Sequence, residues 1–98
     1  MNDNKIEIKV QEDITVLAGP DVGEYFYDQY EDEIYLEDKN IITFSENVDT
    51  VVPSFFTGFF KRLVNDKKNP VNVQILKEHF EFEEKVKKAF EDYIATME

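Results

Sequence analysis

Residues 53–64, PSFFTGFFKRLV, decide the fold of this chain, because four phenylalanines stand within a span of six residues. On a helix these rings, together with Leu63 and Val64, cover a wide arc of the surface. Large apolar side chains in this number are normally buried. The sequence therefore predicts a largely buried helix, packed between a central strand of a sheet and neighbouring helices. The side chains left for water are Thr57, Lys61 and Arg62.

Three residues of this segment indicate how the helix begins and packs. Proline is tolerated in the first turn of a helix, and Pro53 is expected there. Serine is a good helix cap, and we interpret Ser54 as that cap. A glycine inside an apolar helix lets its backbone approach a neighbour closely. We therefore expect Gly58 to mark the closest approach of this helix to the sheet.

Periodic patterns on both sides of this helix supply its packing partners. Alternating or β-branched runs predict strands, and apolar residues at every third or fourth position predict helices. The predicted strands cover residues 5–10, 14–18, 40–44 and 71–75; the first is expected at a sheet edge, and the third is expected to be central and covered on both faces. The predicted helices cover residues 21–36, 53–64 and 78–96, and the first is expected to fray beyond Tyr30. We predict a single domain, residues 1–98, with an α/β fold: a small mixed β-sheet of about four strands with two to three packed helices.

Composition and charge limit the classes of function. The 98 residues include no cysteine, which excludes disulfides and thiolate chemistry, and no apolar run approaches the ~20 residues that span a bilayer. The polar start, MNDNKIEIKV, lacks the pattern of a signal peptide, and we expect a cytoplasmic protein. A net charge of −11 repels nucleic-acid phosphates and anionic membranes and attracts basic surfaces. We expect a protein partner with a basic surface, no direct nucleic-acid binding and no membrane binding.

No residue pattern in the chain is typical of a catalytic or cofactor site. The single histidine, His79, has no serine or cysteine nucleophile near it in sequence, which favours an ordinary surface histidine. The acids between residues 28 and 38 lack the glycine and the spacing of a calcium loop, and the three glycines form no phosphate-binding pattern. We expect no catalytic residue, no metal and no cofactor, and a protein that is not an enzyme.

The segment 21–38 is the strongest candidate for a binding surface, because it carries eight acids, four tyrosines and no base. One helix cannot bury all of these rings on a single ridge, so some are expected to lie exposed beside the carboxylates. Tyrosine surrounded by acids suits the recognition of a basic protein surface. Ordinary tyrosines at the edge of the core are the competing interpretation. The predicted partner-binding residues are Glu24, Tyr25, Tyr27, Asp28, Glu31 and Asp32.

Residues 40–64, NIITFSENVDTVVPSFFTGFFKRLV, resemble the STAS-like family, in particular its short bacterial and phage proteins of unknown function. The resemblance rests on an apolar strand, a polar turn, and a helix that starts with Ser54-Phe55 and continues with Phe59-Phe60. It implies a non-catalytic regulator that binds one protein partner. The anti-sigma-factor antagonists of this family carry a phosphorylatable serine in an Asp-Ser-Ser-Gly turn at this helix start. Here the turn has one serine and no preceding aspartate, which disfavours Ser54 as a phospho-switch.

Two functions are consistent with these observations. The first is a regulatory protein–protein interaction module of the STAS-like type. The second is a small acidic inhibitor of the phage type, which presents carboxylates in place of nucleic-acid phosphates and blocks a nucleic-acid-binding or defence protein. A regulator needs one compact patch, whereas a mimic needs acids in two rows at phosphate-like spacing. The sequence leaves a homo-oligomer open.

Overall fold

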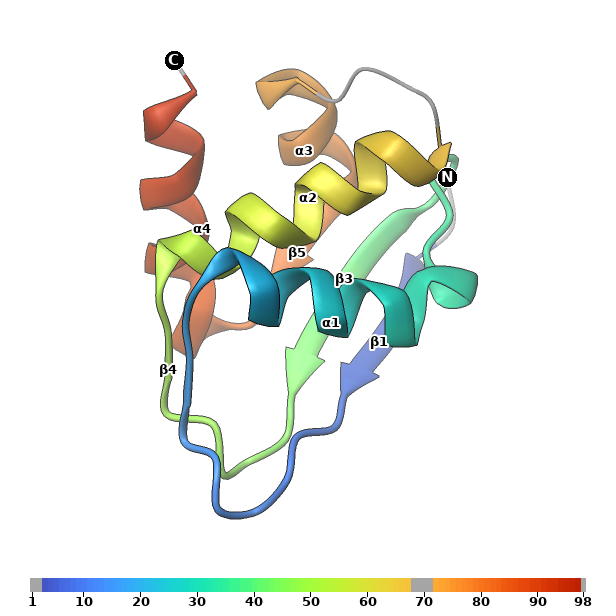
Figure 1. Ribbon diagram of the computed structural model, residues 1–98. Coiled ribbons are helices and arrows are strands. Elements are labelled where there is room, and N and C mark those ends of the chain that lie inside the picture. The colour runs from blue at the N-terminus through green and yellow to red at the C-terminus, as the bar shows by residue number, and fades with distance from the viewer. Residues whose placement is uncertain (1–2, 68–71, 98) are drawn as a thin grey trace.

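A computed structural model describes residues 3–67 and 72–97, which form an α/β fold, and the predicted fold class is therefore confirmed (Figure 1). The elements are β1 (Asp3–Ile8), β2 (Val16–Leu17), α1 (Pro20–Tyr30), the short 3-10 helix η1 (Glu31–Glu33), β3 (Lys39–Phe44), β4 (Thr50–Val51), α2 (Pro53–Lys67), α3 (Val73–His79), β5 (Phe80–Phe82) and α4 (Glu84–Thr96).

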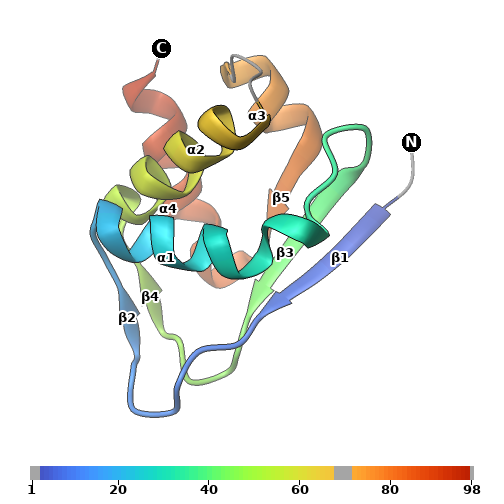
Figure 2. The same ribbon diagram turned by 45° about the vertical axis from the view of Figure 1, so that its right-hand side comes forward.

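Every strand pair in the described residues is parallel, and the strands form two small sheets in place of one mixed sheet. The larger sheet has the order β1-β3-β5, so β3 is central and β1 lies at an edge, as predicted; the smaller sheet pairs β2 with β4. The connection from β1 to β3 and the connection from β3 to β5 move in the same direction across the larger sheet. Because such connections are right-handed, their helices lie on the same face of the sheet. Figure 2 shows the helices on that face and the other face open. The prediction that β3 is covered on both faces is wrong, because Lys39, Ile41 and Thr43 are half-exposed.

The chain bends sharply after β1 and again after β3, and the two bends lie against each other. The first bend connects β1 to β2, and the second connects β3 to β4. Because β1 pairs with β3 and β2 pairs with β4, the two bends run side by side (Figure 2). The side chain of Asn47 joins them, because its Nδ2 donates to the carbonyl oxygens of Gln11 at 2.7 Å and Ile14 at 2.8 Å. The hydroxyl of Ser45 accepts a hydrogen bond from the Val10 N–H at 3.0 Å. These contacts join the two bends into one hydrogen-bonded unit.

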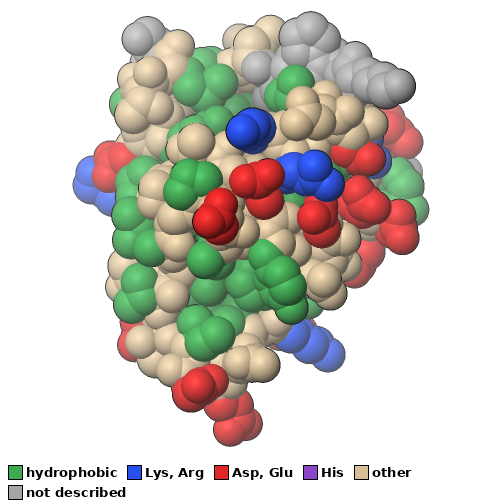
Figure 3. Space-filling view, viewed as in Figure 1, with side chains coloured by type: hydrophobic (Ala, Val, Ile, Leu, Met, Phe, Trp, Pro, Cys, Tyr) green, Lys and Arg blue, Asp and Glu red, His purple; other side chains and the backbone are tan. Residues whose placement is uncertain are grey.

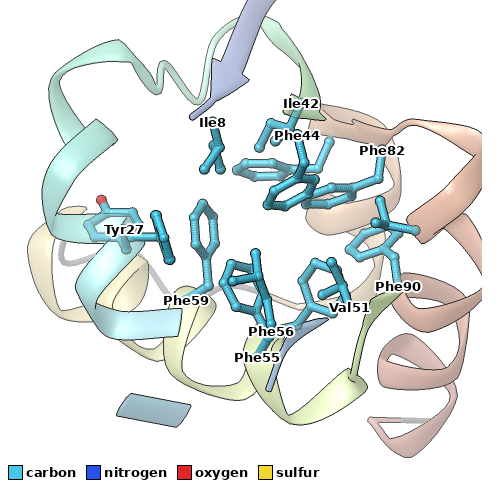
Figure 4. Packing of buried hydrophobic residues seen from close by; sticks show 14 of the residues in the cluster. Ile8, Tyr27, Ile42, Phe44, Val51, Phe55, Phe56, Phe59, Phe82 and Phe90 are labelled. Atoms are coloured by element: carbon cyan, nitrogen blue, oxygen red, sulfur yellow. The ribbon is translucent and has the colours of Figure 1, made fainter. Parts of the chain in front are cut away.

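Helix α2 supplies the centre of the core. Phe55, Phe56 and Phe59 have no exposed surface, and Phe60 is 2% exposed. Figure 4 shows the rings of α2 directed toward those of the sheet, and the ring centroid of Phe56 lies 4.9 Å from that of Phe82 on β5. Burying a phenylalanine side chain in this way contributes roughly 1.5–3 kcal/mol. The predicted burial of this helix between the sheet and its neighbouring helices is confirmed.

Two glycines bring the backbones of α1 and α2 into contact. A Cβ atom at Gly58 would lie 1.8 Å from the carbonyl oxygen of Pro20, and one at Gly23 would lie 1.9 Å from that of Phe55. Gly58 therefore marks the closest approach to α1, and the prediction that it faces the sheet is wrong. The physical reason is that the rings on both sides of Gly58 fill the sheet-facing arc, so that the glycine falls on the stripe of α2 that faces the neighbouring helix.

Asn40 on β3 is the buried polar side chain of the described core. Its Oδ1 accepts hydrogen bonds from Asn4 Nδ2 at 2.9 Å and from the Tyr35 N–H at 3.2 Å. Its Nδ2 donates to the carbonyl oxygens of Tyr35 at 2.9 Å and His79 at 3.0 Å. A buried amide is tolerated when its donors and acceptors are paired, and this one connects β1, β3 and the end of α3.

The C-terminal part differs most from the sequence prediction. The strand predicted for residues 71–75 is wrong where the structure describes it: α3 begins at Val73, and residue 71 lies outside the described residues. The Asn72 side chain caps this helix by accepting a hydrogen bond from the Ile75 N–H at 3.0 Å. The third strand of the larger sheet is β5, and the last helix begins at Glu84 instead of residue 78. The alternation of apolar residues that predicted the strand covers only five positions. Asn72, which caps a helix at this point, outweighs so short a pattern.

Candidate partner-binding surface

Helix α1 carries the candidate surface, and the sequence fixes both of its ends. Gly19 has a φ of 93°, a conformation that favours glycine, and it leads into Pro20 at the first helical position. The helix ends at Tyr30, which confirms the predicted fraying beyond that residue, and the three acids of η1 follow. Carboxylates are unfavourable at the negative end of a helix dipole, so these acids oppose a longer helix.

The structure divides the six predicted partner-binding residues into two groups. Five keep solvent exposure, and we refer to them as the α1 face: Tyr25 is 59% exposed, Asp28 and Asp32 are also exposed, and Glu24 and Glu31 are half-exposed. Figure 3 shows acidic side chains across this surface and toward η1, with basic side chains beside them and hydrophobic ones below. The sixth residue, Tyr27, has no exposed surface, and the prediction that it contacts a partner is wrong.

Tyr27 belongs to the stripe of α1 that faces α2. Gly23 stands four residues before it on the same side of the helix, which brings the backbone of α2 close enough to cover the ring. The ring packs edge-on against Phe59, with centroids 5.4 Å apart, and its hydroxyl donates to Asp66 Oδ2 at 3.0 Å. Burial, with this hydrogen bond, raises the pKa of Tyr27 well above its usual range. The hydroxyl therefore stays protonated at every ordinary pH.

One carboxylate of the α1 face has a partner within the protein. Asp28 Oδ1 accepts hydrogen bonds from Arg62 on α2, from Nε at 3.1 Å and from Nη2 at 2.9 Å. The hydrogen bond from Asp28 raises the pKa of the Arg62 guanidinium, and the charges of Asp28, Glu24 and Glu31 act in the same direction. An exposed pair of this kind contributes little to stability. Arg62 therefore interrupts the acidic row at its middle.

Tyr25 lies beside a surface hollow that the sequence did not reveal. The hollow has a volume of about 390 Å³ and lies between α1 and the bend that follows β1. Its lining residues are Lys9, Gln11, Ile14, Asp21, Val22, Tyr25 and Phe26. The Tyr25 ring packs edge-on against Phe26, with centroids 5.1 Å apart, so it is held at the rim. Ile14 is far from α1 in sequence, and no pattern in the chain places it there.

Ser54 has a structural contact that differs from the predicted one. It is the second residue of α2, and its hydroxyl accepts a hydrogen bond from the Gly19 N–H at 2.9 Å. The interpretation of Ser54 as the cap of its own helix is wrong, because α2 already begins at Pro53. Ser54, Gly58 and Arg62 follow one another at four-residue spacing, and all three contact α1 or the residue before it. This spacing places Ser54 on the stripe that faces α1.

The described residues contain little that resembles a reaction centre. His79 ends α3, is half-exposed, and its Nδ1 lies 3.2 Å from the carbonyl oxygen of Asp38. Among residues 3–67 and 72–97, no group of three or more histidine, aspartate or glutamate side chains is arranged to hold a metal ion. Within the same ranges, no helix has the length and apolar character needed to cross a membrane.

No family model, curated protein or solved structure matches this chain. The STAS-like resemblance stays a prediction from the sequence.

Proposed function

We propose that this protein is a non-catalytic regulatory module of the STAS-like type that binds a basic protein surface through its α1 face. The observation that carries the proposal is the exposure of Tyr25, an aromatic ring 59% open to solvent at the rim of a hollow and among carboxylates. Tyrosine is enriched among the residues that dominate binding energy, since it buries a large area at a small cost in side-chain entropy.

The charges around Tyr25 support recognition of a basic partner. Glu24, Glu31 and Asp32 form no ion pair among the described residues, so their charge is available to a partner. A net charge of −11 adds a long-range attraction that speeds the encounter with a basic surface. The aromatic ring then supplies short-range contact, whereas the acids supply orientation and rate.

The alternative, a nucleic-acid mimic, is less favoured by the position of Arg62. A mimic needs rows of unopposed carboxylates, but the guanidinium of Arg62 lies 2.9 Å from Asp28. Asp28 stands between Glu24 and Glu31 in the sequence. A guanidinium in the row would repel a surface built for phosphates.

The proposal is tested by affinity capture from a bacterial lysate with three baits: the unchanged protein, Tyr25→Ala and Tyr35→Ala. Tyr35 is the matched control, because it is also an exposed tyrosine, at 48%, but lies outside α1. We expect Tyr25→Ala to lower the affinity for the captured partner by about tenfold or more, and Tyr35→Ala to leave it unchanged. Both variants should melt like the unchanged protein, since neither ring is buried.

Equal affinity of Tyr25→Ala and the unchanged bait would contradict the proposal. Capture of a nucleic-acid enzyme that is lost at high salt, with no effect of Tyr25→Ala, would favour the mimic instead.

A further inference from the structure

The two edges of the larger sheet are protected differently. At the β1 edge, the Lys9 N–H donates to the hydroxyl of Tyr30 at 2.8 Å, so a side chain of α1 occupies a main-chain group that would otherwise be free. Lysines at positions 5 and 9 also discourage another strand from pairing there. Among the described residues, β5 has a strand neighbour only on its β3 side.

The hydrogen bonds between β3 and β5 identify which main-chain groups of β5 point outward. The Glu83 N–H donates to the carbonyl oxygen of Ile42, and peptide groups of alternate residues point to opposite sides of a strand. Glu81 therefore faces β3, while Phe80 and Phe82 direct their main-chain groups to the free edge. The Phe80 N–H is used, since it donates to Leu76 at the end of α3. The free edge thus offers the N–H of Phe82 and the carbonyl oxygens of Phe80 and Phe82.

A groove runs along this free edge, with α4 as its second wall. It has a volume of about 720 Å³, and we call it the β5–α4 groove. The apolar side chains that form its floor are Phe80, Phe82, Phe90 and Ile94. The ring centroids of Phe82 and Phe90 are 4.7 Å apart (Figure 4). Both rings belong to the core, at 5% and 8% exposed, so the groove meets a small part of each, at the junction of the strand and the helix. An edge strand beside a helix-walled groove is the arrangement in which domains add an extended peptide to a sheet.

The charges at the rim indicate what kind of peptide fits. Lys39 is neutralised by Glu81 at 2.9 Å, and Glu83 is engaged by Lys85 and by the N–H of Phe44. On α4, Glu84 and Glu91 line the groove and form no ion pair among the described residues. One lysine of α4, Lys87, lines the groove and likewise has no ion pair there, so acids outnumber bases among these side chains of α4.

The two free carboxylates are two helical turns apart, about 10 Å along α4. Side chains on one face of an extended peptide are separated by about 7 Å for every second residue and about 13 Å for every fourth. Basic side chains four residues apart can therefore reach both carboxylates, with an apolar side chain between them over the rings of the floor.

We propose that the β5–α4 groove binds an extended segment of a partner protein as an added strand next to β5. The segment carries two basic residues four positions apart, with an apolar residue midway between them. This surface is separate from the α1 face. Helix α1 contacts the β1 edge through Tyr30, and β5 is the opposite edge of the sheet. A second copy of this chain is a poorer occupant, since two bodies of charge −11 repel each other.

The test uses the peptide Thr-Lys-Thr-Val-Thr-Lys-Thr, blocked at both ends, with the full-length protein. Binding is followed by fluorescence anisotropy, and amide hydrogen exchange of Phe82 and Glu81 is followed by NMR. We expect the peptide to slow exchange of the Phe82 N–H by about tenfold or more and to leave Glu81 unchanged, because Glu81 is already bonded to β3. A version of the peptide in which alternate main-chain nitrogens are methylated keeps its charge but loses its strand hydrogen bonds. This version should not bind.

Charge variants separate the groove from general attraction. The double variant Glu84→Lys with Glu91→Lys should lose the peptide, whereas Glu12→Lys with Glu46→Lys, an equal charge change on the exposed bends, should bind with nearly unchanged affinity. Four results with the peptide would overturn the proposal: equal binding of the N-methylated peptide, binding without protection of Phe82, equal losses in the two double variants, or no binding at about 1 mM. Self-association that protects Phe82 without peptide would overturn it in favour of a second copy. None of these measurements involves Tyr25, so their failure is distinct from failure of the α1 face.

Discussion

Replacing Gly58 by alanine perturbs the contact between α1 and α2 at its tightest point. The added Cβ atom would lie 1.8 Å from the carbonyl oxygen and 2.6 Å from the carbonyl carbon of Pro20. Both atoms belong to the backbone, so no side chain can rotate away. The two helices must move apart by roughly 1.5 Å to restore an ordinary contact, which loosens the Tyr27–Phe59 ring pair as well.

Two effects of opposite sign determine how much Gly58→Ala changes the free energy of unfolding. Alanine is favoured over glycine inside a helix by about 1 kcal/mol. Overpacking of a rigid core costs about 1–3 kcal/mol, and contact between two backbones belongs at the upper end or beyond. We expect Gly58→Ala to lower the free energy of unfolding by about 2 kcal/mol or more, which for a domain of this size corresponds to a fall in melting temperature of about 10 °C or more.

The assay is thermal and urea unfolding of Gly58→Ala, with Thr57→Ala as control. Thr57 is the exposed neighbour on the same helix, so its replacement should be neutral or slightly stabilising. Gly23→Ala should cause a similar loss, and the double variant should cost less than the sum of the two, because the first Cβ already separates the helices. A Gly58→Ala protein that melts at or above the unchanged protein would show that helix propensity dominates and that this backbone contact does not exist.

Two further substitutions test the hydrogen bonds that α1 and its preceding loop make with α2. The pKa of Tyr27 is higher in the folded than in the unfolded chain, so its contribution is complete below about pH 10 and is lost as the pH rises further, by up to about 1.4 kcal/mol per pH unit. Tyr27→Phe should therefore flatten the dependence of urea-unfolding stability on pH above pH 10, at a loss of about 1 kcal/mol near neutrality; identical pH profiles would mean that the hydroxyl is not buried. Ser54→Ala leaves the Gly19 N–H without its acceptor and should lower stability by about 1–2 kcal/mol, whereas Ser54→Thr retains the hydroxyl and should lose less. Equal melting of the alanine variant and the unchanged protein would remove any energetic role for this bond.

The sequence predicts those parts of the fold in which one pattern has one interpretation. The four phenylalanines of α2 admit no solvent-exposed helix, and the β-branched run in β3 suits a central strand. The pattern fails where two helices share a contact. Apolar residues at four-residue spacing, such as Val22 and Phe26, were sufficient to predict α1. They left out the second stripe, through Gly23 and Tyr27, which packs against α2. The glycine was the available signal, because a small residue inside a helix indicates close packing against another backbone.

The candidate site was predicted in part for a similar reason. Exposure of Tyr25 and Asp28 follows from the period of a helix with one buried side. The hollow beside Tyr25 does not, because Ile14 and Lys9 reach it through the bend between β1 and β2, whose direction depends on hydrogen bonds from Asn47. The free edge of β5 was hidden for another reason: Phe82 also fits the four-residue spacing of a helix with Val86 and Phe90, and only pairing with β3 decides between the two.

Parallel pairing of every described strand has a consequence for how the chain acquires its structure during synthesis. Partners are far apart in sequence, as in Asp3 with Lys39, Val16 with Thr50 and Asn40 with Phe80, so no local hairpin can serve as a nucleus. Closing such long loops costs entropy before any pairing is gained, and folding is correspondingly slow. On the ribosome, the rings of α2 emerge before β5 and α4 exist to cover them. A chain that stalls before residue 80 therefore presents an aromatic surface to chaperones, and residues 80–96 end that exposure.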